Sequence, residues 1–263
     1  MYLNDQIGDC TCAAAGHMEQ AWTSAASTLV TVPDSAVLSL YEQVSGYDPR
    51  TGANDDGAVM QDVLNQWRKV GLGGHTILGF AQIDHTDITQ VKAAISSFGG
   101  VYVGVNFPAS AMNQFNYGQP WTVVSGSQIK GGHAINVGAY DSTNTTTCVT
   151  WGAEQKIAYA WWQKYVEEAW VVVTQEWINA NGTTPAGEAV ADLGAQFTQL
   201  TGEPSPFPVP APPEPTPAPV PVPSPTPPDS AAVDLAEALK RFSVATSCPK
   251  YLKTAAQAWL AEQ

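Results

Sequence analysis

The chain has 263 residues, a mass of 27.9 kDa and a formal net charge of −13, and only 13% of its residues are charged. A chain of this length buries one sizeable core of up to about 200 residues, with room for appendages. Its negative charge repels nucleic acids and anionic membrane surfaces, so neither partner is expected.

The amino-terminal residues contain neither the basic region nor the apolar run of a secretion signal. No later segment has the roughly 18 consecutive apolar residues that a membrane-spanning helix needs. The sequence therefore predicts neither a signal peptide nor a membrane anchor. It leaves the location unknown, with a host cytoplasm, a virion or release from a longer precursor as alternatives.

The first part of the main domain is predicted to be helical. Residues 12–22 are rich in Ala, and helical apolar spacing recurs over residues 35–44 and 58–70. Asp87 is expected to cap a further short helix over residues 88–98.

The second part is predicted to be rich in strands. Residues 100–107, 132–140, 146–151 and 169–174 combine β-branched and aromatic side chains with turn-forming flanks. Helices followed by strands indicate an α+β fold of two lobes rather than a parallel α/β sheet. A cleft between two such lobes is the natural place for a ligand.

A proline-rich segment divides the chain. Proline recurs at almost every second position over residues 204–228, which predicts an extended polyproline II spacer. We therefore expect a main domain over residues 1–200, a linker over 201–228 and a short helical tail over 229–263. Two helices of about 12 residues make no independent core. The tail is expected to dock on a partner protein, another copy or the main domain, and a weakly ordered tail is the alternative.

The four cysteines are Cys10, Cys12, Cys148 and Cys248, too few and too irregularly placed for a disulfide framework. A bond between the closely spaced Cys10 and Cys12 would be strained, so free thiols are expected. No second Cys/His pair at ligand spacing follows them. The sequence therefore predicts no metal site and implies no cofactor.

Cys10 directly precedes the Ala-rich helix, which places its thiol at a helix N-terminus. Unpaired N–H groups and the helix dipole there stabilise a thiolate, so the thiol pKa is expected to fall below its usual value of about 8.5. A small buried apolar side chain is the alternative interpretation.

A nucleophilic thiolate usually needs an imidazole base, which can lie far away in the sequence. His17 would point away from the start of the helix, and His75 and His85 lie in predicted surface loops. His133 opens a strand after two glycines, so rigid backbone would hold its ring. It is the best candidate for the base.

The order of motifs resembles that of the papain family of cysteine peptidases. The motifs are Gly8-Asp9-Cys10 at a helix start, residues 56–60, residues 91–95 followed by 99–105, residues 131–141 around His133, and Thr150-Trp151-Gly152. The resemblance runs from about residue 4 to about residue 175, and the variant looks like papain-like proteins of bacteriophages and actinobacteria. It implies a papain-like two-lobed fold, with an N-terminal helical lobe and a C-terminal antiparallel β-barrel-like lobe.

Carried over residue by residue, the resemblance makes Cys10 the nucleophile and His133 the base. Asn4, six residues before Cys10, would donate its amide to the oxyanion, with Gln6 as a substitute. Cys12 is the alternative nucleophile, because Gln6 stands six residues before it.

The chain departs from the family at the third catalytic residue. The family's orienting Asn should stand just before Thr150, where this chain has Val149. Thr150, Asp141 or a backbone carbonyl would then have to orient the imidazole. The loss of the Asn would either slow turnover or mark a domain that has kept the fold without the activity.

The resemblance thus implies a hydrolase that cleaves peptide or isopeptide bonds through a thioester, acting on a protein or on cell-wall peptide. A catalytically inactive or weak papain-like binding or structural module, associated with a virion, is the alternative. Acyl transfer to an amine, as in transglutaminases, would use the same Cys and His, but the acidic residue of those enzymes generally follows the His more closely than Asp141 follows His133.

Overall fold

A computed structural model describes residues 1–207 of the chain. Most of the predicted proline-rich linker and the whole predicted tail, residues 229–263, lie outside the described residues. None of the helices within residues 1–207 is long and apolar enough to cross a membrane.

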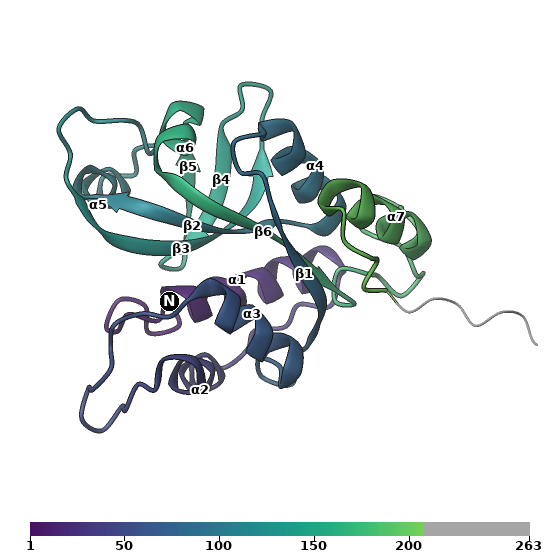
Figure 1. Cartoon of the computed structure of the whole chain (residues 1–263), viewed down its shortest axis with the longest axis horizontal. Coiled ribbons are helices and arrows are strands. Elements are labelled where there is room, and N and C mark those ends of the chain that lie inside the picture. Colours follow the sequence, from purple (N-terminus) through teal and green to yellow (C-terminus); the bar gives the residue numbers. More distant parts are fainter. Residues whose placement is uncertain (208–263) are drawn as a thin grey trace, which may run out of the picture. The chain divides into compact units, whose positions relative to one another are not determined.

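Three helices form the amino-terminal part of the domain: α1 (Cys10–Ala25), α2 (Asp34–Ser45) and α3 (Met60–Lys69). They lie together on one side of the sheet (Figure 1). Their buried faces share one core, in which the rings of Trp22 and Trp67 stack with centroids 5.7 Å apart. The helices predicted over residues 12–22, 35–44 and 58–70 are confirmed to within a few residues at each end.

The remaining architecture is a six-stranded antiparallel sheet with the order β1-β6-β2-β3-β4-β5. Its strands are β1 (Ile77–Ile83), β2 (Val101–Pro108), β3 (Ile129–Tyr140), β4 (Thr146–Thr150), β5 (Ala153–Ile157) and β6 (Val166–Thr174). The α+β class is as predicted. The β-barrel-like lobe is instead a sheet with β1 and β5 at its two ends, because the ladder does not close between them.

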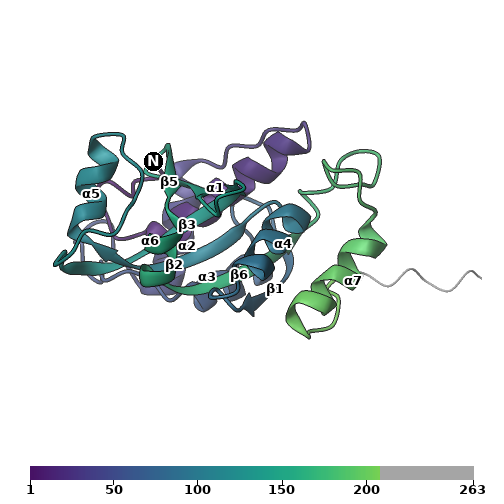
Figure 2. The ribbon, with the colours of Figure 1, turned by 90° about the horizontal axis from the view of Figure 1, so that it is seen from above.

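Four further helices flank the sheet: α4 (Ile88–Phe98), α5 (Ala109–Asn116), α6 (Tyr159–Tyr165) and α7 (Val190–Thr201). The predicted cap of α4 is present, since the Asp87 carboxylate accepts hydrogen bonds from the first turn of the helix. Helices α4 and α7 lie side by side in both views (Figures 1 and 2). Phe207, in the segment predicted as linker, is buried in the same core as α7.

Side chains on the two faces of β3 enter different cores. Ala134 belongs to the core shared with α1, whereas Ile135 belongs to the core on the opposite face of the sheet. This alternation follows from the two-residue period of a strand. It brings the backbone of β3 against the start of α1, where Cys10 lies.

Candidate active site

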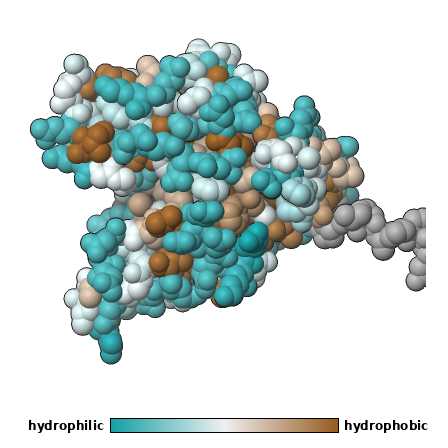
Figure 3. Space-filling model, viewed as in Figure 1, coloured by the Kyte–Doolittle hydropathy of each residue, from teal (hydrophilic) through white to brown (hydrophobic). Residues whose placement is uncertain are grey.

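A cleft with a volume of about 650 Å³ separates the helices α1–α3 from the sheet. Figure 3 shows the molecule hollowed between these two groups of elements. Cys10, at the start of α1, and His133, in β3, both line it. The rest of the lining comes from the ends of α2 and α3, from the loop between them, and from β2 and β6. The structure thus brings together two side chains that are far apart in the sequence.

Cys10 is the first residue of α1, as predicted, but its thiol pKa moves in the opposite direction to the prediction. Burial raises the pKa of Cys10, and the carboxyl of Asp9 raises it further, while a hydrogen bond from the backbone of Ala134 lowers it. Removal of the sulfur from water outweighs the stabilising N–H groups at the helix start. The expectation of a lowered pKa is therefore wrong, and the resting thiol is protonated at neutral pH.

Asp9 is a buried carboxyl group directly beside the nucleophile candidate. Asp9 is 0% exposed, its Oδ1 accepts a hydrogen bond of 3.1 Å from Asn4 Nδ2, and its Oδ2 has no hydrogen-bond partner within residues 1–207. Burial raises the pKa of Asp9 to about 7. The sequence does not reveal this buried group, because an Asp before a helix normally caps it, whereas within residues 1–207 Asp9 makes no capping side-chain bond.

The two amides expected at the oxyanion do not line the cleft in this structure. Asn4 directs its amide nitrogen at Asp9, and Gln6 is exposed. The Cys10 N–H, by contrast, belongs to the first turn of α1, where backbone donors have no partner within the helix. The backbone is therefore better placed than either side chain to bind an oxyanion.

His133 is 8% exposed and is held on three sides. Its Nε2 lies 2.8 Å from Thr150 Oγ1, its ring stacks on Trp151 with centroids 4.5 Å apart, and the edge of Phe107 approaches it at 5.3 Å. Burial lowers the pKa of His133 to about 4, so the ring is neutral at pH 7. Within residues 1–207 no hydrogen bond joins it to Cys10, and both groups rest uncharged.

A tight turn places Trp151 over the imidazole. Trp151 and Gly152 connect β4 to β5, with φ angles of 46° and 72°. Two successive left-handed residues are typical of a type I′ hairpin turn, which costs a bulky residue such as Trp more than it costs glycine. In this conformation Trp151 stacks on His133, whose hydrogen-bonded partner Thr150 is also buried.

Of the candidates for orienting the ring, the structure brings Thr150 to His133 and leaves Asp141 elsewhere. Asp141 lies in the turn after β3, where its Oδ1 accepts hydrogen bonds from the backbone of Thr143 and Thr145. Asp141 stands eight positions after His133, about 26 Å away at the usual rise of a strand. Val149 faces the opposite side of β4 and lines a different depression. The acyl-transfer interpretation, which needs Asp141 at the ring, is not supported.

The other cysteines in the described residues do not line the cleft. Cys12 and Cys148 are both 0% exposed, and burial raises the pKa of each thiol. Cys10, Cys12 and Cys148 are free thiols, as predicted. Cys12 belongs to the core under α1 and does not line the cleft. The geometry therefore favours Cys10 over Cys12 as the candidate nucleophile.

The cleft wall is acidic. Its lining includes Asp56, Asp62, Glu167 and Glu168, and among the described residues it includes no Lys or Arg. Glu168 Oε2 accepts a hydrogen bond of 2.7 Å from Trp170 Nε1, which holds this carboxylate in place. Carboxylates that line a cleft attract positively charged groups.

No family model and no curated protein sequence matches this chain. Its fold is similar to the crystal structure of xylellain, a cysteine protease from Xylella fastidiosa, with a TM-score of 0.51 over 64% of this chain and 80% of that one. The two sequences are 15% identical, so the likeness concerns the fold alone. The amino-terminal helices followed by an antiparallel sheet match the fold of a papain-like cysteine protease.

Proposed function

We propose that this chain is a cysteine-dependent hydrolase that cleaves peptide or isopeptide bonds, with Cys10 as nucleophile and His133 as general base. The observation that carries the proposal is that these two side chains line one cleft, the first at a helix N-terminus and the second bonded to Thr150. The likeness of the fold to a cysteine protease supports it.

The bond to Thr150 suggests how the base is prepared. With its proton on Nε2, the imidazole donates to Thr150 Oγ1 and leaves Nδ1 unprotonated. Nδ1 then accepts the thiol proton as Cys10 Sγ attacks the scissile carbonyl carbon, and the imidazolium protonates the leaving amine when the C–N bond breaks. Water, deprotonated by the same nitrogen, hydrolyses the thioester and restores the thiol.

The negative charge on the attacked oxygen needs donors. The backbone N–H of Cys10 is the first of these, because the start of α1 leaves it without a helical partner. Asn4 does not line the cleft in this structure, so its amide, which donates one hydrogen to Asp9, would have to move towards the cleft to offer the other to the oxyanion. Gln6 is exposed and also lies outside the cleft lining, so the same movement would be needed for it to serve as the substitute.

The substrate follows from the wall of the cleft. The cleft has a volume of about 650 Å³, and its lining includes four carboxylates and, among the described residues, no Lys or Arg. Such a cleft suits an extended peptide that carries Lys, Arg or a free amine. Protein substrates and cell-wall peptides with amino-bearing side chains both belong to this class. The proposed chemistry requires no cofactor.

The test compares the full chain with Cys10→Ala and His133→Ala on a library of fluorogenic peptides with basic, neutral and acidic side chains. We expect cleavage by the unmodified chain, its loss in both variants, and its loss on alkylation mapped to Cys10 by mass spectrometry. Cys12→Ala is the matched control and should keep activity, since Cys12 lies outside the cleft. Cleavage that survives in Cys10→Ala would contradict the proposal.

A non-catalytic peptide-binding module is the second candidate. It is favoured by the raised thiol pKa of Cys10 and by the lack of a hydrogen bond between Cys10 and His133 within the described residues. Catalytic hydrogen bonds often form only once substrate is bound, so this geometry does not exclude hydrolysis. Binding of basic peptides without cleavage, unchanged by alkylation of Cys10, would identify this function.

A further inference from the structure

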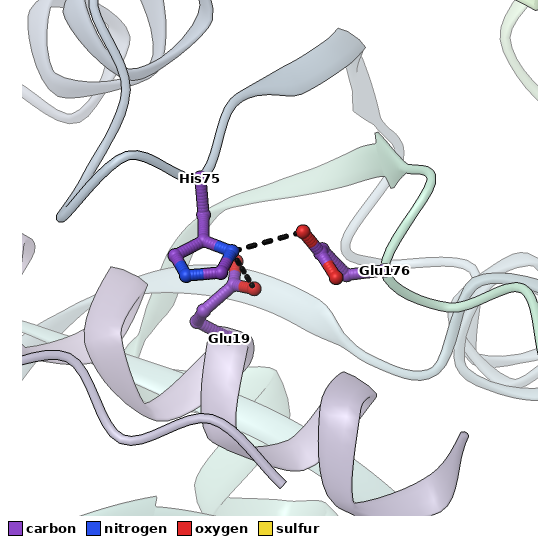
Figure 4. A group of neighbouring side chains, drawn as sticks. All are labelled: Glu19, His75 and Glu176. Atoms are coloured by element: carbon purple, nitrogen blue, oxygen red, sulfur yellow. Dashed lines mark hydrogen bonds and ion pairs between the residues drawn. The ribbon is translucent and has the colours of Figure 1, made fainter. Parts of the chain in front are cut away.

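Three side chains from distant segments converge outside the cleft. Glu19 belongs to α1, His75 to the loop between α3 and β1, and Glu176 to the segment after β6 (Figure 4). His75 Nδ1 lies 2.9 Å from Glu176 Oε1 and 3.5 Å from Glu19 Oε1. All three donor atoms lie within 4.8 Å of one another. None of these residues lines the candidate active site.

The innermost member of this cluster lacks a hydrogen bond. The side chain of Glu19 is 1% exposed, and its buried Oε1 has no hydrogen-bond partner among the described residues. It is directed at the His75 ring (Figure 4). A single Nδ1–H serves one acceptor well, and in this structure it serves Glu176. A buried carboxylate oxygen without a donor is costly, so the site calls for a positive group between all three side chains.

We propose that Glu19, His75 and Glu176 bind a divalent transition-metal ion, with zinc as the expected ion. One imidazole nitrogen and two carboxylate oxygens form a mixed donor set that zinc accepts, whereas calcium and magnesium prefer oxygen ligands alone. Donors around tetrahedral zinc lie about 3.3 Å apart at usual bond lengths. The two distances from His75 Nδ1, 2.9 and 3.5 Å, lie on either side of that value.

The exposure of the cluster is also suited to a bound ion. The side chains of His75 and Glu176 are 26% and 35% exposed, so an ion can enter from solvent and keep a water as a further ligand. Glu19 closes the inner side. The bound ion would tie the helix that begins with Cys10 to the loops flanking β1 and β6, away from the reacting groups. The role is therefore structural.

The sequence alone predicts no metal site, because these three ligands do not stand at short, regular spacing. His75 and Glu176 are 101 residues apart, and Glu19 lies within a helix whose other features direct attention to its start. Only the folded chain brings the three together.

The experiment measures zinc taken up by the full chain during equilibrium dialysis, by mass spectrometry of the metal content. The parent carries Cys10→Ala, which removes the thiol in the cleft as a competing ligand. We expect one zinc per chain in the parent and in the control His85→Gln. We expect loss of that zinc in His75→Gln and in Glu176→Gln. Zinc should raise the thermal midpoint of the parent by several degrees and leave those of the two variants unchanged.

Circular dichroism of the metal-free variants establishes whether each is folded. If His75→Gln does not fold, Glu176→Gln carries the test, because Glu176 is partly exposed and its replacement disturbs the core less. Equal zinc uptake by parent and folded variants would overturn the proposal, and so would a folded parent that takes up no zinc. Uptake of calcium or magnesium in preference to zinc would overturn the choice of ion.

Discussion

Thr150 Oγ1 lies 2.8 Å from His133 Nε2, and this bond comes from the last residue of β4. The residue before it, Val149, stands where the papain-like pattern has an Asn, but it faces away from the ring. A hydroxyl both donates and accepts, whereas an amide oxygen only accepts. Thr150 therefore positions the ring well but restricts its tautomer less strictly than an amide would.

Replacing the hydroxyl tests this positioning role. We expect Thr150→Val to lower kcat about 10- to 100-fold with little change in KM, because the ring loses its orienting bond while the cleft keeps its shape. Thr150→Ser retains the hydroxyl and should stay within a few-fold of the parent. Steady-state kinetics on one peptide checks both variants. A kcat for Thr150→Val equal to that of the parent would remove Thr150 from the machinery.

The neutral burial of His133 makes stability depend on pH. Its folded pKa of about 4 lies below the unfolded value of 6.5, so its contribution is present above about pH 6.5. That contribution, about 3 kcal/mol, is lost as pH falls from 6.5 towards 4. Urea unfolding between pH 7 and pH 4 should show a smaller decline in His133→Gln than in the parent. His85→Gln is the control, and an equal decline in all three chains would contradict the assignment.

Asp9 should restrain the thiol beside it. Because its pKa of about 7 lies above the ordinary value of 3.8, the carboxylate forms near neutrality and then raises the pKa of Cys10. Asp9→Asn is expected to speed iodoacetamide labelling of Cys10 between pH 7 and pH 9, measured by mass spectrometry. Asp5→Asn, at an exposed position, should label like the parent. Identical rates in all three chains would show that the charge of Asp9 is not felt at the sulfur.

Asp9 also makes the free energy of unfolding depend on pH, but in the opposite direction to His133. A folded pKa raised to about 7 means that Asp9 favours the folded state below pH 3.8, and that this contribution is lost as pH rises through 7. Asp9→Asn should therefore reduce the loss of unfolding free energy between pH 5 and pH 8, as measured by urea unfolding. A steeper loss in the variant than in the parent would be the contrary result.

The acidic wall of the cleft predicts a preference for basic peptides, which one substitution should weaken. Glu168→Gln is expected to lower kcat/KM about fivefold for peptides with Lys or Arg in the cleft and to leave neutral peptides unaffected. Glu154→Gln, outside the cleft on β5, is the matched control. Parallel assays of basic and neutral peptides at low and high salt check the charge effect. An equal loss for both peptides would indicate a packing defect instead.

The elements predicted best were those with strong local signals. Helix α4 combined a capping Asp87 with helical apolar spacing, and β2 and β3 were rich in β-branched residues. Strand β5 was missed because its sequence, Ala-Glu-Gln-Lys-Ile, is largely polar, as an edge strand can be. Its place in the sheet depends on pairing with β4, which no local pattern reveals.

For the site, the sequence was sufficient to nominate Cys10 and His133 but not to describe their ionisation. The direction of each pKa shift depends on how much water the fold removes, and this depends on residues from distant segments. The burial of Asp9 and the contact between Glu19 and His75 also depend on tertiary packing, which the local sequence does not reveal. Local sequence identifies chemical groups, and tertiary burial determines their charge.

The order of the strands has a consequence for the newly synthesised chain. Strand β6 is the last of the six to leave the ribosome, yet it lies between β1 and β2 and supplies Glu167 and Glu168 to the cleft. Until Val166–Thr174 has emerged, β1 has no partner, β2 has a free edge, and one wall of the cleft is missing. Cys10 is therefore made early but gains its complete surroundings only when nearly the whole domain has been translated.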